Sequence, residues 1–304
     1  MAVLVVGSIA LDSVKTPFGE VKEVLGGSAT FASYAASFFC LPHLVGVVGN
    51  DFPKEYINLL KEKPIDIKGL EIIAGETFRW KGYYDFDLNT ANTVKTELNV
   101  FENFRPRIPE EYRKIKYVFL GNIDPELQLE VLKQVDKPEL VIGDTMNFWI
   151  TNKRKALGKL LKKLNVLVIN DAEARQLSEE PNLIKAGKKL LSSGPGYIII
   201  KKGEHGALLF SETSFFSLPA YPLECLYDPT GAGDSFAGGF LGYLAGVKKI
   251  GRNQFRKALV FGSVMASFSV EDFSLNRLKR LRQEEITQRY NEFVAISHFE
   301  NFKL

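Results

Sequence analysis

Short apolar runs that alternate with helical patterns are the feature that most constrains the fold of this chain. Nearly continuous apolar runs are typical of strands that are buried on both faces of a mostly parallel sheet. The predicted strands are residues 3–6, 44–48, 117–120, 140–142, 166–169 and 197–200. The predicted helices are residues 29–40, 54–63, 125–134, 153–164, 172–177, 234–245, 252–270 and a charged C-terminal helix from about Leu278. This order predicts one three-layer α/β/α domain over residues 1–304.

Two segments depart from this pattern, and both have sequence features of antiparallel hairpins. From Thr77 the apolar residues recur at every second position, which places Phe78, Trp80, Tyr84, Phe86 and Leu88 on one face. The segment 12–24 has Pro17 and Gly19 at its middle, where a turn is expected. From these residues alone, the two hairpins are either ordinary surface excursions or parts of one small sheet.

The composition is that of a globular protein, with 45% hydrophobic and 25% charged residues and a net charge of +3. Basic residues are scattered rather than clustered, so we expect no nucleic-acid partner. The two cysteines, Cys40 and Cys225, form no metal-binding or disulfide pattern, which favours a cytoplasmic location. The apolar run 2–6 is too short to cross a membrane, and no membrane association is expected.

The string from Asp228 to Asp234, Asp-Pro-Thr-Gly-Ala-Gly-Asp, leads directly into a small-residue apolar helix. Backbone amides of Gly231, Ala232 and Gly233 at a helix start favour an anion, and the helix dipole adds positive charge. Asp234 in the first turn could accept a proton from a substrate hydroxyl, which is the combination that phosphoryl transfer to an alcohol requires. An ordinary glycine-rich helix start is the structural alternative. A dinucleotide-binding motif is disfavoured, because basic residues rather than an acid follow at the expected offset.

The whole string resembles the C-terminal signature of the ribokinase-like (PfkB-type) sugar and nucleoside kinases. The resemblance implies a ribokinase-like fold whose mostly parallel sheet carries a small β-sheet lid, here at about residues 12–25 and 74–104. Such a lid excludes water from the reaction. In many relatives the lid also forms a dimer contact, so the resemblance offers a homodimer as an expectation.

The resemblance also implies the acceptor site. Asp12 follows the first strand and is expected to bind a substrate hydroxyl, while Gly26 and Gly27 are expected to line the sugar pocket. The family usually has Asn at the position of Phe31 and often at that of Ala10, so two polar sugar contacts are missing. This favours a larger or more apolar acceptor such as a nucleoside. Phe31 and Trp80, together with Phe86, are candidates for stacking on a base, and core packing is an equally good interpretation of them.

On the nucleotide side, Asn170 and Glu173 match the Asn-x-x-Glu motif that positions Mg²⁺ through its waters, although a helix capping box explains the same pair. Lys201 is a candidate phosphate contact or a solvated lysine. By resemblance, Gly203 and Gly206 form the turn beneath ATP, and Ser263 flanks the adenine. Asp228 corresponds to a monovalent-cation ligand in relatives that need K⁺, and the sequence leaves this open.

The leading hypothesis is an ATP-dependent sugar kinase that phosphorylates a primary hydroxyl, with Asp234 as general base. The transition state would be stabilised by Mg²⁺ and the amides of the glycine turn. The alternative is a nucleoside kinase that acts on an adenosine-like substrate. A non-catalytic regulatory protein on the same fold is a third hypothesis, which the intact motif disfavours.

Overall fold

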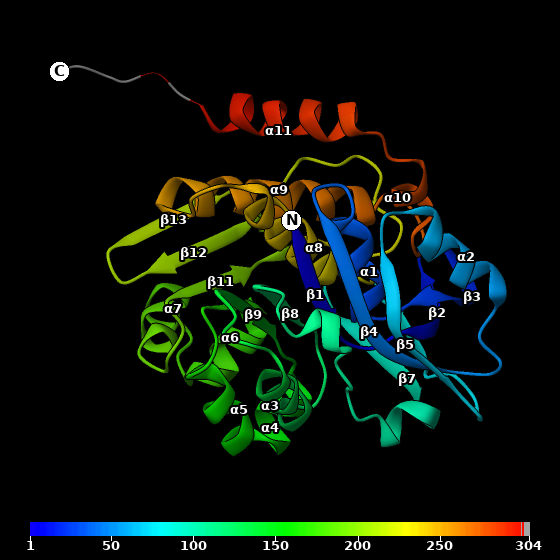
Figure 1. Cartoon of the computed structure of the whole chain (residues 1–304). Coiled ribbons are helices and arrows are strands. Elements are labelled where there is room, and N and C mark those ends of the chain that lie inside the picture. Colours follow the sequence, from blue (N-terminus) through cyan, green and yellow to red (C-terminus); the bar gives the residue numbers. More distant parts are fainter. Residues whose placement is uncertain (299, 301–304) are drawn as a thin grey trace.

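The computed structural model describes residues 1–298 and 300, and a nine-stranded sheet forms its centre (Figure 1). The strand order is β13-β12-β11-β10-β9-β8-β1-β4-β5. All neighbouring strands are parallel except the pairs β11–β12 and β12–β13, which are antiparallel. The strands are β1 (Ala2–Val6), β4 (Leu41–Gly49), β5 (Asp66–Ile73), β8 (Tyr117–Leu120), β9 (Leu140–Asp144), β10 (Val166–Asn170), β11 (Tyr197–Lys201), β12 (Ala207–Ser211) and β13 (Ser214–Leu218).

Helices cover both faces of this sheet, as the apolar strands require. Successive residues of β1 face different cores: Val3 and Val5 pack with α1, α8 and α9, while Leu4 and Val6 pack on the opposite side. The first layer contains α1 (Ser28–Ala36), α8 (Ala232–Gly246) and α9 (Arg252–Ser269). The second contains α3 (Pro125–Gln134), α4 (Asn147–Asn152), α5 (Arg154–Leu161), α6 (Asp171–Ser178) and α7 (Leu183–Leu191). The predicted three-layer α/β/α class is confirmed.

The remaining helices lie at the periphery. Helix α2 (Lys54–Glu62) packs near β5 at the edge of the sheet. The predicted C-terminal helix is two helices, α10 (Asn276–Arg280) and α11 (Gln283–Ser297), because the chain is extended at Leu281 and Arg282. Helix α11 lies along the outer side of α9 (Figure 1). Among the described residues no helix combines the length and the apolar character that crossing a bilayer requires.

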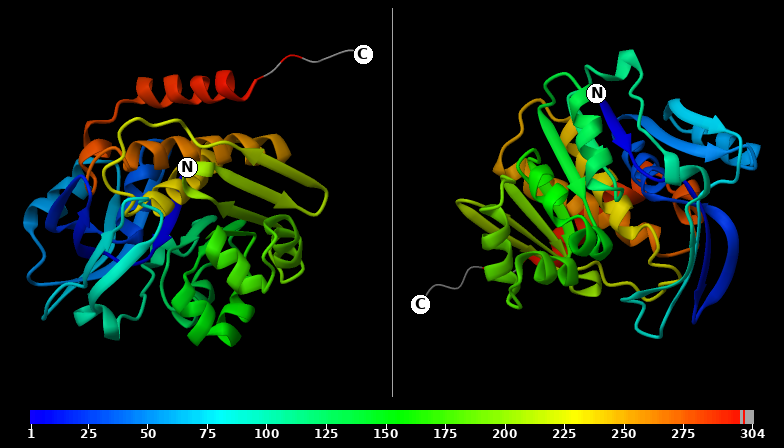
Figure 2. Two further views of the ribbon diagram at one scale, coloured as in Figure 1. Left: turned by 180° about the vertical axis from the view of Figure 1, so that it is seen from behind. Right: turned by 90° about the horizontal axis from the view of Figure 1, so that it is seen from below.

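A separate four-stranded sheet, the lid, lies to one side of the main sheet (Figure 2). Its order is β3-β2-β6-β7, and its strands are β2 (Ala10–Thr16), β3 (Gly19–Gly26), β6 (Arg79–Tyr84) and β7 (Ala91–Glu97). The two predicted hairpins are present, and they are joined by a parallel pairing of β2 with β6. The lid therefore holds together two segments that are far apart in the sequence.

The predicted alternation beyond residue 84 is wrong. Strand β6 ends at Tyr84, where the chain turns: the Leu88 amide donates to the Asp85 carbonyl at 3.0 Å, and Leu88 adopts a φ of 56°. Phe86 is 89% exposed at this turn instead of lying on the inner face with Trp80. The polar turn residues Asp85, Asp87 and Asn89 accommodate the reversal, which outweighs the period-two pattern.

Candidate active site

Gly231 shapes the start of helix α8, and its position excludes a larger residue. Gly231 adopts a φ of 75°, and a Cβ built on it would overlap the ring of Phe31 in α1. The chain can therefore turn tightly into α8, with Asp234 in the first turn. The Ala232 amide donates to the Pro229 carbonyl at 3.2 Å, so this member of the predicted anion cup already has a partner within the turn. The first amides of a helix have no partner within it, and they make its start attractive to anions.

Lys201 adds a full positive charge to this helix start. It is the last residue of β11, and a Cβ built on Gly233 would lie only 2.6 Å from its Nζ atom. The same Nζ atom lies 3.6 Å from Oδ2 of Asp144, the last residue of β9. The ammonium group and the helix start thus face one spot, which suits a phosphate group. The phosphate contact of Lys201 stays a prediction, and the solvated-lysine alternative is disfavoured because the side chain is only 19% exposed.

The charges around Lys201 shift one another's pKa. Burial alone would lower the pKa of Lys201, but the carboxylates of Asp144, Glu173 and Asp234 outweigh it and raise the pKa. Burial, reinforced by the charge of Asp144, raises the pKa of Asp234 to about 7, and Lys201 opposes this rise. A carboxylate with a pKa near neutrality is well suited to accept a proton from a substrate.

Asn170 and Glu173 open helix α6 with a reciprocal capping box. The Asn170 side chain accepts from the Glu173 amide, and the Glu173 side chain accepts from the Asn170 amide, both at 2.8 Å. Burial, with the nearby charge of Asp144, raises the pKa of Glu173 to about 7. The structural interpretation of this pair is therefore correct, and it leaves one Glu173 oxygen outside the capping box.

These groups fit Mg²⁺ held mainly by water and phosphate. Within residues 1–298 and 300, no group of three or more His, Cys, Asp or Glu side chains is arranged as a metal site. Burial, and then the charge of Asp144, nevertheless raise the pKa of the half-buried Glu173, and a cation near these two carboxyl groups would oppose that rise. Mg²⁺ usually keeps several waters and takes one or two carboxylates, so this sparse donor set is appropriate.

The predicted acceptor side consists of Asp12, in β2 of the lid, and of Gly26 and Gly27 at the end of β3. A Cβ on Gly26 would overlap the Asp12 carboxylate, and Gly27 has a φ of 95° with no room for a side chain against the Ser8 backbone. Asp12 is 6% exposed. Burial, followed by the charges of Asp228 and Asp234, raises the pKa of Asp12 to about 8. Donated hydrogen bonds from hydroxyl groups would stabilise its ionised form.

The other predicted residues occupy more varied positions. Phe31 is 1% exposed, so its ring supports the Gly231 turn and has no open face for a base. Trp80 is half-buried in the lid, next to Asp12 in the strand pairing, and donates to Thr93 Oγ1 at 3.1 Å. Gly203 and Gly206 have φ values of 52° and 84° in the turn after β11. Ser263 is half-buried within α9.

Asp228 is buried in the loop that precedes α8. Its Oδ1 atom accepts from the Thr230 amide at 2.9 Å, and its Oδ2 atom accepts from the Ser274 amide at 3.4 Å. Burial raises its pKa, and these hydrogen bonds oppose the rise. The carboxylate therefore organises the loop through backbone donors, and its part in K⁺ binding stays a prediction.

Two residues of this site were missed by the sequence analysis. Asp144 lies at the carboxyl end of a parallel strand, where ligands of open α/β sheets bind; the predicted strand stopped at Ile142 and so did not reach it. Tyr84 was placed on the lid face, but nothing in the local pattern indicated that its hydroxyl meets Thr230, at 3.3 Å. This contact joins the end of β6 to the loop before α8, and no sequence pattern links these two segments.

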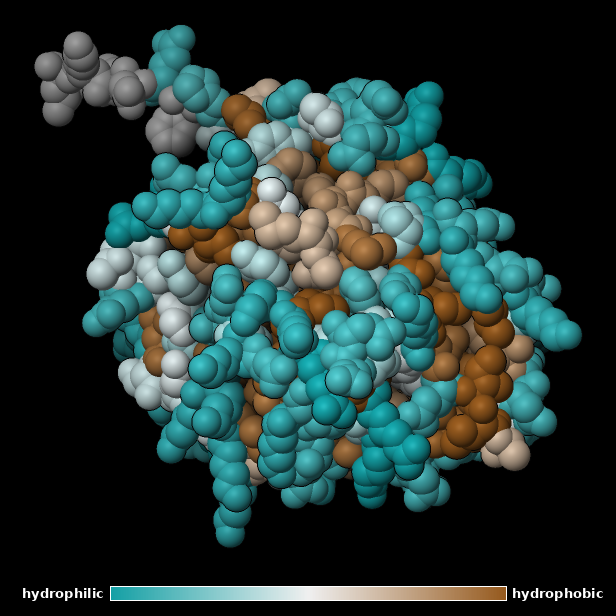
Figure 3. All heavy atoms as spheres, in the orientation of Figure 1, coloured by the Kyte–Doolittle hydropathy of each residue, from teal (hydrophilic) through white to brown (hydrophobic). Residues whose placement is uncertain are grey.

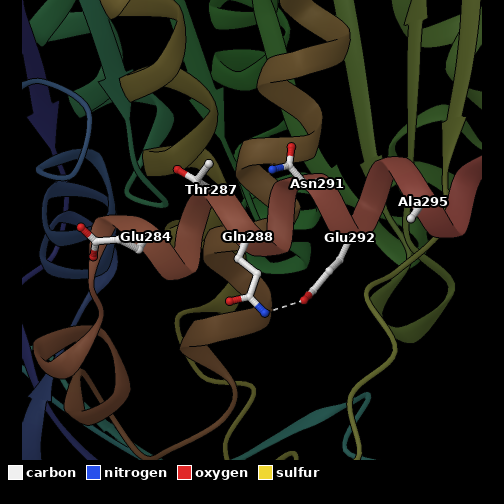
Figure 4. Close-up of a pocket in the computed structure, with 6 residues that line it drawn as sticks. All are labelled: Glu284, Thr287, Gln288, Asn291, Glu292 and Ala295. Atoms are coloured by element: carbon white, nitrogen blue, oxygen red, sulfur yellow. Dashed lines mark hydrogen bonds between the residues drawn. The ribbon is translucent and has the colours of Figure 1, made fainter.

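A surface hollow also lies along α11, and it is distinct from the residues described above (Figure 4). Its lining comes from one helix: Glu284, Thr287, Gln288, Asn291, Glu292 and Ala295. Gln288 donates to Glu292 at 2.9 Å within it. The charged groups suited to phosphate chemistry lie instead at the carboxyl ends of β9, β10 and β11 and at the start of α8.

The protein has a mostly parallel α/β sheet, a helix start that suits an anion, an acid in the first turn of that helix, and a lid. These features are those of an ATP-dependent phosphotransferase with an alcohol group as acceptor. Comparison with known proteins agrees. The chain belongs to the pfkB family of carbohydrate kinases, whose family model matches residues 2–279. It is a ribokinase-like sugar or nucleoside kinase, and kinases of this family use ATP with Mg²⁺.

Among curated proteins, the chain is 31% identical over 250 residues to a cytidine kinase of Thermococcus kodakarensis, covering 80% of this chain and 88% of that protein. It is 26% identical over 290 residues to a nucleoside kinase of Methanothermobacter thermautotrophicus, covering 86% and 82%. Among solved structures, the nucleoside kinase of Methanocaldococcus jannaschii, a ribokinase-family member, has a TM-score of 0.76 at 22% identity, covering 96% and 98%. This last similarity supports the ribokinase-like fold.

Proposed function

We propose that this protein is a nucleoside kinase that transfers the γ-phosphoryl group of ATP to the primary hydroxyl of a nucleoside. The observation that carries this choice is the 31% identity, over most of both chains, with a protein named cytidine kinase. The apolar residues Ala10 and Phe31, at positions where the family often has Asn, agree with it, because both are buried and offer no polar contact to a free sugar. The alternative raised by the sequence is thus preferred to the leading sugar-kinase hypothesis.

In the proposed reaction, Asp12 accepts hydrogen bonds from the acceptor's other hydroxyls and Gly27 leaves room for its sugar ring. Asp234 takes the proton of the primary hydroxyl while that oxygen bonds to the γ-phosphorus and the bond to the bridging oxygen of ADP breaks. Lys201 and the amides of Gly231 and Gly233 hold the phosphate oxygens, whose charge grows in the transition state, while the Ala232 amide stays bonded within the turn. Asp12 is buried, and Asp234 and Lys201 are half-buried, which strengthens their electrostatic effect.

Asn170, Glu173 and Asp144 are the residues that would hold Mg²⁺, through its waters. When bound with the nucleotide, Mg²⁺ supplies positive charge to the phosphate oxygens. Lys201 remains charged beside this group because three carboxylates raise its pKa. The turn at Gly203 and Gly206 and the half-buried Ser263 are proposed to support the nucleotide. K⁺ at Asp228 is proposed as an accessory ion, to be tested by replacing K⁺ with Na⁺ in the assay.

The direct test is ADP release with Mg-ATP against cytidine, uridine, adenosine and inosine, with ribose, fructose and myo-inositol as competing classes. Nucleoside-dependent release, with a 5′-monophosphate identified by mass spectrometry, is the expected result. A 5′-deoxynucleoside is the matched control, because it lacks the reacting hydroxyl and must be inert. Turnover of the free sugars without turnover of any nucleoside would contradict the proposal and return the sugar-kinase hypothesis to first place.

A homodimer through the outer lid face is a second, structural proposal. Exposed apolar residues lie in the lid strands and at the adjoining end of β5: Tyr83 in β6, Val94 in β7, and Ile72 and Ile73 in β5. Figure 3 shows apolar side chains along the side of the molecule where β5 lies. Light scattering after size-exclusion chromatography tests it. A dimer that Val94→Lys converts to monomer is expected, and a monomeric wild-type protein at micromolar concentration would contradict it.

A further inference from the structure

Tyr84 connects the lid to the loop that forms the phosphate site. It is the last residue of β6, and its phenolic oxygen accepts a hydrogen bond from Thr230 Oγ1 at 3.3 Å. Thr230 is itself fixed, because its amide donates to Asp228 Oδ1 at 2.9 Å. A hydrogen bond between two side chains thus joins the lid to the segment between Asp228 and the start of α8.

The strand register explains why this tyrosine faces the site. Asp12 pairs with Trp80, and Val14 pairs with Gly82, so these residues share one face of the lid. Tyr84 is two residues beyond Gly82 and lies on that same face. Its neighbour Tyr83 points to the opposite face and is 41% exposed. The two tyrosines therefore form a natural pair for experiment, one inward and one outward.

The same hairpin also reaches the nucleotide turn. A Cβ built on Gly203 would lie 3.1 Å from Oδ1 of Asn89, which belongs to the turn between β6 and β7. One end of the lid therefore approaches the start of α8 at Thr230 and the turn after β11 at Gly203. The acceptor ligand Asp12 lies on the neighbouring strand β2 of the same sheet.

The chemistry of the pair suits a neutral contact among acids. Burial, and then the charges of Asp228, Asp12 and Asp234, raise the pKa of Tyr84, although the Thr230 hydrogen bond opposes this. The phenol therefore keeps its proton. Since it already accepts from Thr230, its own O–H remains available as a donor near the carboxyl groups of Asp228, Asp12 and Asp234.

We propose that Tyr84 is a positioning residue that couples closure of the lid to the arrangement of the phosphate loop, through its hydrogen bond with Thr230. Closure brings Asp12, carried by the lid, to its working distance from Asp234, carried by α8. Loss of the phenolic hydroxyl loosens this link without removing any group that reacts. The inference rests on the kinase activity and holds for a sugar acceptor as well as for a nucleoside.

The first test does not depend on the acceptor's identity. The chain has two tryptophans, Trp80 and Trp149, so a Trp149→Phe background leaves Trp80 as the lid's own fluorophore. Acrylamide quenching of Trp80 is compared for Tyr84→Phe and the outward control Tyr83→Phe. We expect the quenching constant to rise for Tyr84→Phe and to stay at the background value for Tyr83→Phe. Equal quenching in all three proteins overturns the proposal.

The second test uses kinetics with whichever acceptor the wild-type protein phosphorylates. For Tyr84→Phe we expect the acceptor KM to rise about fivefold, the effect of one hydrogen bond, with a smaller change in kcat. ADP release without acceptor should increase relative to transfer, because the lid excludes water less well. Thr230→Val should raise the acceptor KM as much as Tyr84→Phe does, and the double variant should raise it no further. Thr230→Ser keeps the donating hydroxyl and should have the wild-type KM. Additive effects of the two single variants, or an unchanged KM in Tyr84→Phe, contradict the proposal.

Discussion

At the scale of single residues, the site depends on opposite charges that are buried together. Asp234, Lys201 and Asp144 come from a helix start and two strand ends, and each changes the pKa of another. Buried charges are stable only with partners, so Lys201 and its carboxylates require one another. An incoming phosphate would meet a lysine that is already held in place, so little side-chain entropy remains to be lost on binding.

Replacing the base tests its proposed role most directly. Asp234→Asn keeps the shape of the side chain but cannot accept a proton, so we expect kcat to fall at least about a hundredfold. ATP affinity, measured by isothermal titration calorimetry, should change little, because the amides and Lys201 remain. A variant that retains wild-type turnover would show that another group accepts the proton.

The pH dependence follows from the same carboxyl groups. The pKa is raised to about 7 for Asp234 and to about 8 for Asp12. In the proposed reaction both carboxyl groups act in the ionised form. We therefore expect kcat/KM for the acceptor to be low in acid and to increase with pH through this range to a plateau. Because Lys201 lowers the pKa of Asp234, Lys201→Met should move the acidic limb to higher pH. A flat profile between pH 6 and about pH 8.5 would contradict both assignments.

At the scale of secondary-structure elements, helix α1 packs closely on α8, and these two helices connect the proposed acceptor and phosphate sites. Helix α1 follows the Gly26–Gly27 pair, and α8 carries Asp234. The two helices approach closely because α8 has a glycine at position 238, where a Cβ would overlap the Ala32 carbonyl of α1. A small residue that follows the motif thus sets how closely α8, which carries the proposed base Asp234, packs on α1.

Gly238→Ala tests this contact. The added methyl group must push the helices apart, and we expect a loss of about 1–3 kcal/mol in the free energy of unfolding, together with a lower kcat. Gly158→Ala in α5 is the matched control, because no atom lies within 4 Å of its added Cβ. That variant should gain about 0.5–1 kcal/mol from helix propensity. Urea denaturation measures both, and equal stabilisation by the two substitutions would contradict the packing argument.

At the scale of the whole molecule, the C-terminal helix is held to the body by a charge network outside the site. Glu271, just after α9, pairs with Arg277 at 2.8 Å and with Arg289 of α11 at 2.7 Å. Arg289 also lies over the ring of Phe268, 3.5 Å from its centre. The network is mostly buried, so its members depend on one another more than surface ion pairs do.

Glu271→Gln should therefore destabilise the molecule without changing its chemistry. We expect a loss of about 3 kcal/mol in the free energy of unfolding, because two arginines lose their shared carboxylate in a mostly buried setting. Glu130→Gln is the control, since its pair with Lys133 is exposed and should contribute less than about 1 kcal/mol. Thermal unfolding measures both, while kcat at 25 °C should remain that of the wild type. If kcat fell together with the stability, the network would contribute to catalysis, which would contradict this prediction.

Much of the element order could be predicted from local patterns, and particular failures show the limit. Strand β8 and helix α3 match their predicted bounds, because their residues repeat the periodicity of a buried strand and an amphipathic helix. Strands β5 and β13 were not predicted, since their mixed sequences lie at the two edges of the sheet, where the buried-strand pattern fades. Strand β12 was missed although four of its five residues are buried. Phe86 was misplaced because a turn of polar residues outweighed a continuing alternation.

The sequence by itself determined the α/β class, the two hairpins of the lid and the motif from Asp228 to Asp234, because each depends on residues that are neighbours along the chain. Only the tertiary structure decided that Lys201 lies between Asp144 and the start of α8, and that Tyr84 meets Thr230. These contacts depend on strand order and register, which are set by packing over the entire sheet. No local pattern records them, so the electrostatic environment of Asp234 is a property of the folded molecule.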